Sequence, residues 1–163
     1  MALKNPKEKG NSHERNVANM LTEWSGHKFL RTPSSGAIHN FHDRRVISDI
    51  VAPESLRDFP FSIECKNTEV SWEFNTIIEG TAAMWKQWEQ CTTDADREEM
   101  IPMLVFTKNY RPIYVAIQQE IFDKLKIEPV SYLRVVGQEN LVIIDFKEFL
   151  SLITVEELIK RLV

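Results

Sequence analysis

The sequence predicts a single α/β domain, and three observations lead to this fold class. The chain has 163 residues, of which 43% are hydrophobic, so it is long enough for one well-buried core and too short for two. A helical apolar period near the N-terminus precedes several strand patterns, and helices and strands then follow in mixed order. This order is typical of a sheet covered by helices. The domain is expected to span residues 1–163, with residues 1–10 as a flexible basic tail.

The first expected element is a helix that begins at Asn11 and stops at Gly26. Glu14 lies near the extension of its apolar stripe and is open to two interpretations. It could complete a capping box with Asn11 and bond back to the first turn, or it could reach inward toward a site. The apolar stripe itself has residues at i, i+3, i+4 and i+7: Val17, Met20, Leu21 and Trp24.

Strand patterns follow this helix. A short strand is expected at 28–32, then a turn and a loop or extended arm at 37–45. Residues 46–52 are almost wholly apolar, as expected of a strand covered on both faces. Its polar side chains are Ser48 and Asp49. A carboxylate inside such a run is costly unless it is paired, hydrogen-bonded or metal-bound.

The segment 61–66 alternates apolar and polar residues, as a strand with one buried face should. One face is predicted to carry Phe61, Ile63 and Cys65, and the opposite face Ser62, Glu64 and Lys66.

The second half of the chain is expected to continue with helices and strands. A helix at 74–93 leads to an acidic turn at 94–99. The later elements are a hairpin of strands at 102–107 and 112–117, a helix at 118–125, strands at 130–136 and 141–145, and an amphipathic helix at 147–162.

Composition indicates where the protein is located and whether it contains disulfides. No apolar run approaches the length of a membrane span, and the N-terminus lacks the apolar stretch of a signal peptide. We therefore expect a soluble, intracellular protein without a membrane partner. Cys65 and Cys91 are too few for a disulfide framework, and Cys65 reads as a small core residue.

The charge of the chain is unevenly distributed. The net charge of −4 argues against a generic nucleic-acid coat protein. Residues 1–48 carry +4 and residues 49–163 carry −8. A basic N-terminal segment is a reasonable footprint for a phosphate backbone. A solvated basic tail would explain its first lysines equally well.

Three acidic and basic side chains have the pattern of a hydrolytic site. Glu64 and Lys66 share one strand face, and Asp49 lies on the preceding strand. Hard oxygen ligands of this kind suit Mg²⁺ or Mn²⁺, and an ammonium beside them can hold a water or neutralise an oxyanion. Near two carboxylates Lys66 should stay protonated, so orienting the water is its safer role. The plain alternative is a solvated surface ion pair.

Other side chains could contact DNA, and each has a plain alternative. His39 and His42 could bind zinc, but no further ligand is close in sequence, which leaves backbone contact or plain surface. Trp72, Trp85 and Trp88 could stack on bases, although Trp85 and Trp88, at helical spacing, more often belong to a core or a subunit interface. Three arginines are candidate phosphate contacts or ordinary surface residues: Arg31, Arg44 and Arg45.

Four motifs occur in a fixed order, and a helix with glutamines follows them. They are Lys9-Gly10…Glu14-Arg15, Arg31-x-x-Ser34-Ser35, Ser48-Asp49-Ile50-Val51 and Ile63-Glu64-Cys65-Lys66. Together they resemble the PD-(D/E)XK nuclease superfamily over roughly residues 9–110. The nearest resemblance is to archaeal-type Holliday junction resolvases, including versions carried by viruses. It implies a restriction-endonuclease-like fold, with a central mixed β-sheet flanked by helices.

The resemblance also implies roles for the residues of these motifs. Asp49, Glu64 and the backbone carbonyl of Cys65 would bind the metal ion. Lys66 matches the lysine that orients the attacking water or helps to deprotonate it. Glu14 matches the acid of the first helix, which supports the site from a second side.

The remaining residues of the resemblance are expected at the DNA. Ser35 fits the serine of the resolvase motif and counts among the catalytic candidates, with Ser34 as a substitute one residue earlier. Either Gln87 or Gln90 fills the glutamine position of the following helix. The expected DNA contacts are Lys9, Arg15, Arg31, Ser34, His39, Arg44, Arg45, Gln87 and Gln90.

The resemblance implies a Mg²⁺-dependent endonuclease, in which Mn²⁺ can substitute for Mg²⁺. The enzyme would act as a homodimer on branched DNA, with four-way junctions as the first expected substrate. The alternative is a nuclease of the same fold that acts on duplex or single-stranded DNA ends; a non-catalytic DNA-binding protein is a third reading. Residues 36–48 form a longer link than small archaeal resolvases have, and the stretch after Tyr110 also departs from their pattern. A viral version would act in the host cytoplasm.

Overall fold

The structure of the chain, a computed structural model, describes most of the sequence. None of the helices in the described part is long and apolar enough to cross a membrane. The arm expected at 37–45 lies outside that part. The described residues are 6–32, 47–67, 74–81, 83–108, 111–137 and 139–163.

The strands of the described residues form one mixed sheet of seven strands in the order β1-β2-β3-β4-β5-β7-β6. Its centre is the parallel pair of β3 (Phe61–Asn67) and β4 (Ile101–Thr107), and the other neighbouring strands pair antiparallel. The expected central mixed sheet is therefore confirmed. The remaining strands are β1 (Leu30–Arg31), β2 (Ile50–Val51), β5 (Tyr114–Gln118), β6 (Leu133–Val135) and β7 (Leu141–Asp145).

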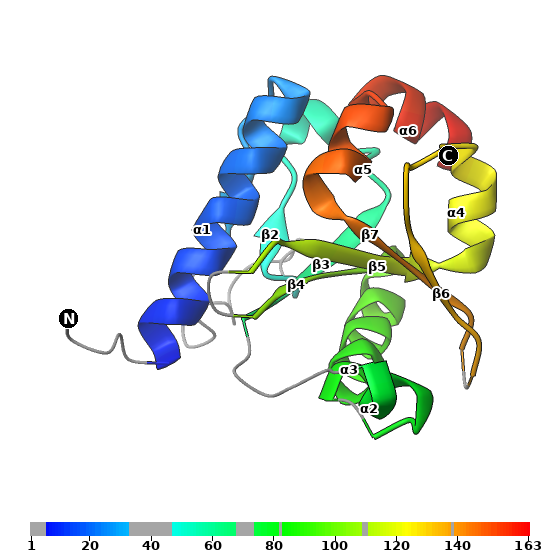
Figure 1. Cartoon of the computed structure of the whole chain (residues 1–163). Coiled ribbons are helices and arrows are strands. Elements are labelled where there is room, and N and C mark those ends of the chain that lie inside the picture. The colour runs from blue at the N-terminus through cyan, green and yellow to red at the C-terminus, as the bar shows by residue number, and fades with distance from the viewer. Residues whose placement is uncertain (1–5, 33–46, 68–73, 82, 109–110, 138) are drawn as a thin grey trace.

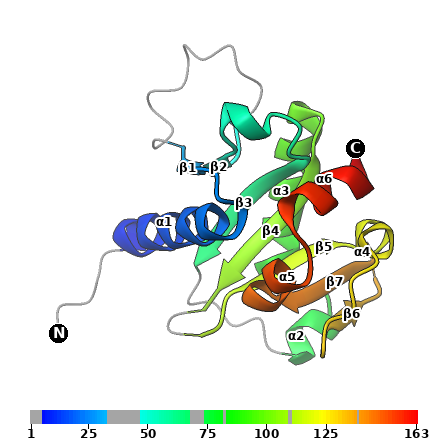
Figure 2. The ribbon, with the colours of Figure 1, turned by 90° about the horizontal axis from the view of Figure 1, so that it is seen from above.

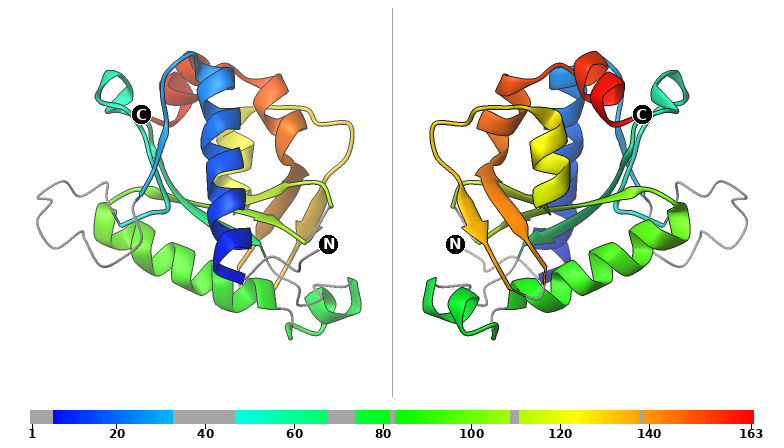
Figure 3. Two further views of the ribbon diagram at one scale, coloured as in Figure 1. Left: turned by 90° about the vertical axis from the view of Figure 1, so that its left-hand side faces the viewer. Right: turned by 90° about the vertical axis from the view of Figure 1, so that its right-hand side faces the viewer.

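Helices cover both faces of the sheet, as the predicted fold class requires (Figures 1 and 3). Seen from above, the larger helical layer lies over the strands (Figure 2). This layer consists of α1 (Pro6–Ser25), α4 (Gln119–Leu125), α5 (Phe146–Leu152) and α6 (Val155–Leu162). The opposite face carries α2 (Phe74–Ile78) and α3 (Ala83–Glu98). A short 3₁₀ helix (Glu54–Leu56) connects β2 to β3.

Each face of the sheet has its own apolar core. On the α1 side, Ile63 of β3 and Val105 of β4 pack with Leu21 of α1. On the α3 side, Leu104 of β4 packs with Trp88 of α3. Alternate residues of β4 thus enter opposite cores, which explains its continuous apolar sequence.

The first helix begins earlier than the sequence indicates. It starts at Pro6 rather than at Asn11, so residues 6–10, expected in the flexible tail, are helical. Proline suits the first helical position because its fixed φ is helical and its missing N–H would be unpaired there anyway. Glu8 in the first turn complements the helix dipole.

The single helix predicted over 74–93 is wrong in two respects. It is two helices, α2 and α3, separated at Gly80, whose φ of +70° favours glycine. The acidic segment 94–99, predicted as a turn, is helical up to Glu98. The reason is that Ala95, fully buried, continues the stripe of Trp88 and Cys91 against the sheet.

The closing helix predicted over 147–162 is also two helices. Ile153 is extended (φ −150°, ψ 140°) and separates α5 from α6. Thr154 then caps α6, because its hydroxyl accepts the backbone N–H of Glu157 at 3.3 Å. The hairpin of β4 and β5 is confirmed by its antiparallel register.

Candidate active site

Asp49 lies where β2 and β3 meet, but not inside a strand. The strand expected over 46–52 is reduced to Ile50–Val51, and residues 47–49 form a bend before it. The backbone still fixes Asp49 firmly. Its N–H donates to the carbonyl of Ile63 at 3.0 Å, and its carbonyl accepts the N–H of Thr32 at 2.9 Å.

The carboxylate of Asp49 faces the next strand. Its Oδ2 accepts the backbone N–H of Cys65 at 2.8 Å. Oδ2 of Asp49 is thus hydrogen-bonded to β3, the strand that carries Glu64. The bond holds the acid at a fixed distance from the neighbouring acid across the strand pair.

Glu64 and Lys66 lie together on the α3 face of β3. The Nζ atom of Lys66 lies 2.6 Å from Oε1 of Glu64. Glu64 is only 6% exposed and Ser62 beside it 2%. A solvated surface pair does not have this burial, so the plain alternative for this motif does not hold. The predicted division of faces is confirmed, since Phe61, Ile63 and Cys65 enter the core on the α1 side.

The two carboxyl groups perturb one another. Burial, and next the negative charge of Asp49, raise the pKa of Glu64 to about 7. Burial also raises the pKa of Asp49, against the opposing effects of the Cys65 N–H, the charge of Lys66 and a hydrogen bond with Glu64. The environment therefore disfavours two negative charges here unless a cation joins them.

Lys66 supplies one positive charge at this point. Burial alone would lower the pKa of its ammonium, but the hydrogen bond to Glu64 and the charges of Glu64 and Asp49 raise it overall. Lys66 is a cation at neutral pH. This state agrees with holding a water rather than removing its proton.

Glu14 joins the site from α1, and its two interpretations can now be separated. Asn11 is inside the helix and cannot cap it, and its side-chain oxygen accepts Nη2 of Arg31 at 3.0 Å. The same guanidinium places Nε 2.5 Å from Oε2 of Glu14. Burial and the charge of Asp49 raise the pKa of Glu14, whereas Arg31 lowers it. Glu14 is thus a half-buried acid within the electrostatic reach of Asp49.

Helix α3 brings in acids that the sequence analysis placed in a turn. Glu98 is 4% exposed, and its Oε1 accepts the backbone N–H groups of Ile47 at 2.8 Å and of Ser48 at 3.0 Å. The charge of Asp94 raises the pKa values of both Asp49 and Glu64. The signal that could have found these acids is helical spacing, because Asp94 and Glu98 follow Cys91 by three and seven residues.

The donor set fits a hard divalent cation. Asp49 and Glu64 offer carboxylate oxygens side by side, the ligand type that Mg²⁺ and Mn²⁺ prefer. Within the described ranges, no group of three or more acidic, histidine or cysteine side chains is placed to hold a metal ion. Two carboxylates would leave most positions around such an ion to water and to a phosphate oxygen, as Mg²⁺ sites usually do.

Comparison with known proteins decides the family. The family model described as phage putative PDDEXK endonuclease matches residues 5–160. The chain belongs to this family. The PD-(D/E)XK resemblance is therefore confirmed, and the chain is a nuclease of the PDDEXK type.

Similar proteins include a phage protein and an archaeal one. Protein D14 of Escherichia phage T5 is 28% identical over 160 residues, which cover 94% of this chain and 97% of D14. A solved structure of Archaeoglobus fulgidus Hjc, a Holliday junction resolvase, is similar with a TM-score of 0.41 at 16% identity, over 92% of this chain and 99% of Hjc. The phage family and the phage relative agree with a resemblance that includes versions carried by viruses.

Several expected contact residues of this PDDEXK nuclease lie on described helices. Gln87 is half-buried on α3, and its buried Oε1 has no hydrogen-bond partner among the described residues, whereas Gln90 is exposed. On α1, Nε of Arg15 donates to the carbonyl of Asn11 at 3.2 Å. The backbone carbonyl of Lys9 accepts Nδ2 of Asn67 at 3.5 Å.

Some predicted residues of the nuclease are core or lie outside the described residues. Trp88 is 2% exposed, and its indole donates to Glu139 at 2.6 Å, so it is a core residue. Cys65 is buried in the core as expected. Outside the described residues lie Ser34, Ser35, His39, His42, Arg44, Arg45 and Trp72.

His13 is a buried polar residue that the sequence analysis did not single out. It is 5% exposed, and its Nε2 lies 3.2 Å from the carbonyl of Val105. Burial lowers its pKa. The ring thus fastens α1, one residue before Glu14, to the central strand β4.

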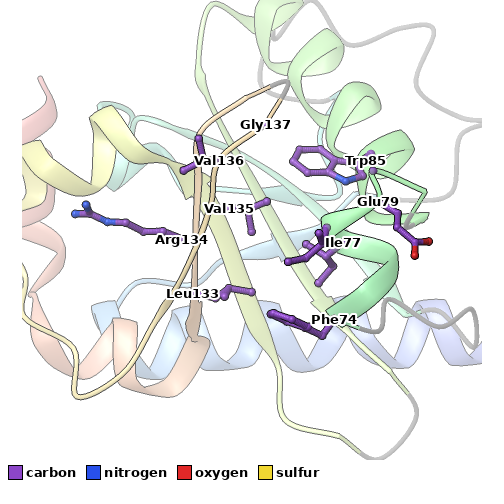
Figure 4. A pocket seen from close by; sticks show the side chains of 11 residues that line it. Phe74, Ile77, Glu79, Trp85, Leu133, Arg134, Val135, Val136 and Gly137 are labelled. Carbon is purple, nitrogen blue, oxygen red and sulfur yellow. The ribbon is translucent and has the colours of Figure 1, made fainter.

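A groove on the nuclease lies apart from the carboxylates. It runs between α2 and the edge strand β6, and none of the described catalytic candidates, Glu14, Asp49, Glu64 and Lys66, lines it. Figure 4 shows Phe74, Ile77 and Trp85 on one side of it and Leu133 and Val135 on the other. Its walls are mainly apolar, so it does not offer the chemistry of phosphodiester hydrolysis.

Proposed function

We propose that this nuclease is a Mg²⁺-dependent endonuclease that cuts branched DNA, with four-way junctions as its substrate. The observation that carries the catalytic part is the pair of Asp49, half-buried, and Glu64, buried, with Nζ of Lys66 2.6 Å from Oε1 of Glu64. Two acids that resist joint ionisation, beside a lysine, are a poor choice for stability alone. They are a suitable arrangement for a divalent cation.

Each residue of the site has a role in this proposal. Asp49 and Glu64, with the carbonyl of Cys65, would hold the metal ion. A bound divalent cation would stabilise charge on the scissile phosphate and make its water more acidic. Lys66 would hold the attacking water through its ammonium or neutralise the developing oxyanion. Glu14, fixed by Arg31, would support the site from α1.

The DNA-binding part rests on the ordered motifs and on the basic charge of residues 1–48. Lys9 and Arg15 of α1 and Gln87 of α3 would contact DNA on either side of the acids. Ser35 stays a catalytic candidate of the proposal, and Mn²⁺ stays a substitute metal. The other expected DNA contacts also remain part of it: Arg31, Ser34, His39, Arg44, Arg45 and Gln90. A homodimer would place two such sites on symmetric strands of a junction. We take residues 1–163 as one nuclease domain that acts inside the host cell.

A cleavage assay tests the proposal. A labelled immobile four-way junction is incubated with Mg²⁺ beside a linear duplex of matched sequence and a flap. Wild type is compared with Glu64→Ala and with Glu120→Ala. The second variant removes an exposed Glu–Lys pair, 2.8 Å to Lys124, away from the site.

Paired, symmetric nicks near the branch point that Glu64→Ala loses and Glu120→Ala keeps are the expected result. Cleavage that does not depend on branching but still requires Glu64 would support the alternative function, a nuclease that acts on duplex or single-stranded DNA ends. Junction binding without cutting, in wild type and Glu64→Ala alike, would replace the enzyme by a DNA-binding protein.

A further inference from the structure

Glu98 is a buried carboxylate at the end of a helix, where it does not stabilise the helix. It is the last residue of α3, and it is 4% exposed. A negative charge at the C-terminal end of a helix opposes the helix dipole. Its burial adds a desolvation cost unless the charge is compensated. A purely structural helix end would favour a lysine, an arginine or an apolar residue there.

The compensation comes from two backbone N–H groups far away in sequence. Oε1 of Glu98 accepts the N–H of Ile47 at 2.8 Å and that of Ser48 at 3.0 Å. Its Oε2 is buried and has no hydrogen-bond partner within the described part of the chain. The carboxylate is therefore directed at the two residues that precede Asp49.

Those two residues have no strand to hold them. Strand β2 covers Ile50–Val51, and backbone hydrogen bonds to Ile63 and Thr32 continue its pairing back to Asp49, but among the described residues none reaches the N–H groups of residues 47 and 48. Besides Glu98, Thr32 also holds this segment, because its hydroxyl donates a hydrogen bond to the carbonyl of Ser48 at 2.6 Å. The N–H groups of residues 47 and 48 thus depend on Glu98.

Helix α3 also touches the strand that carries the second acid. The buried thiol of Cys91 lies against the backbone of Glu64 and of Met103. Glu98 follows Cys91 by seven residues, on the same helix face. One rigid helix therefore contacts β3 at Glu64 and the bend before Asp49.

We propose that Glu98 is a positioning residue that sets the place of Asp49 relative to Glu64 by holding the amides of Ile47 and Ser48. The metal-binding consequence rests on the proposed function, in which Asp49 is a ligand. Groups that orient a metal ligand typically change metal affinity or activity 10–100-fold when they are removed.

Four proteins test this role: wild type, Glu98→Ala, Glu98→Gln and Glu148→Ala. The glutamine variant keeps an oxygen that can accept both amides. Glu148→Ala is the matched control, since Glu148 holds the N–H of Val130 at 2.6 Å away from the site. Amide hydrogen exchange of residues 47–51 is measured without metal, and Mn²⁺ alone is titrated by calorimetry.

In Glu98→Ala we expect exchange at residues 47–51 to be roughly 10-fold faster, because two hydrogen bonds to a charged acceptor are lost. We expect its Mn²⁺ affinity to fall about 10-fold or more. Glu98→Gln should recover both readouts, and Glu148→Ala should change neither. If Glu98→Ala does not fold, Glu98→Asp, which withdraws the carboxylate by one methylene, should give the same pair of effects.

Unchanged exchange at residues 47–51 in Glu98→Ala would overturn the proposal. An equal loss of Mn²⁺ affinity in Glu98→Ala and Glu148→Ala would also overturn it, because the effect would then be general destabilisation. Failure of the proposed function looks different. Wild type would then bind no Mn²⁺, while hydrogen exchange would still decide whether Glu98 holds the segment.

Discussion

Replacing Glu64 with glutamine should stabilise the metal-free protein at alkaline pH. In the unfolded chain the carboxyl of Glu64 ionises near its ordinary pKa of 4.5, whereas burial and the charge of Asp49 raise its pKa to about 7 in the folded protein. Between these values the folded state binds more protons than the unfolded state. The free energy of unfolding of wild type therefore falls as the pH rises from about 4.5 to about 7.

The size of this effect follows from the two pKa values. Each pH unit within the window is worth about 1.4 kcal/mol, so the full loss is on the order of 3 kcal/mol. Glutamine does not titrate, so Glu64→Gln escapes this loss. The difference in unfolding free energy between variant and wild type should thus grow in the variant's favour by about 3 kcal/mol from pH 4 to pH 8.

Urea unfolding in EDTA at several pH values from 4 to 8 measures this difference. Using the change with pH removes any constant effect of the substitution on packing. The ion pair with Lys66 is already included in the pKa of Glu64, since Lys66 lowers it against burial and the charge of Asp49. Glu120→Gln is the control, since the pKa of this exposed carboxyl is lowered by Lys124, and its pH dependence should be small and of opposite sign. A difference between Glu64→Gln and wild type that stays constant from pH 4 to pH 8 would refute the electrostatic reasoning for the site.

Three further predictions concern the metal, Arg31 and Trp88. At pH 8, Mn²⁺ at about 100 times its dissociation constant should stabilise wild type by roughly 2.7 kcal/mol and leave Asp49→Asn nearly unchanged in a thermal melt. Arg31→Ala removes the cation that lowers the pKa of Glu14, so the acidic limb of the pH–rate profile should move to higher pH; an unmoved limb would separate Glu14 from catalysis. Trp88→Phe loses the part-buried hydrogen bond to Glu139 and should cost about 1–3 kcal/mol in unfolding free energy with unchanged DNA affinity. Weaker DNA binding at full stability would instead favour base stacking by Trp88.

The strand that carries Glu64 could be predicted because its pattern is local. Alternation over 61–66 fixes both the strand and the faces of its side chains, and the structure has them as predicted. The order of elements predicts an α/β domain, and the mixed sheet flanked by helices is what the resemblance to PD-(D/E)XK nucleases implies. The bend before Asp49 could not be predicted, because residues 46–52 are apolar enough for a longer strand and only the pairing of β2 with β3 limits it.

The contributions of Glu14 and Glu98 depend on partners distant in the sequence. Sequence spacing left Glu14 between a cap and a site residue, and its ion pair with Arg31 decides the question. The acids after residue 93 resemble a turn when read locally. Their helical continuation depends on the burial of Ala95 against the sheet and on the amides that Glu98 meets.

Single-turnover cleavage of a four-way junction by Asp49→Asn, with junction binding measured in parallel, tests the central claim most directly. The substitution keeps the shape of the side chain and its hydrogen bond from the N–H of Cys65 while it removes the charge that would hold the metal ion. We predict that the cleavage rate of Asp49→Asn falls by at least about 10³-fold, which corresponds to several kcal/mol of lost transition-state stabilisation. Its affinity for the junction should be unchanged. Cleavage at the wild-type rate would contradict a catalytic site built on Asp49 and Glu64.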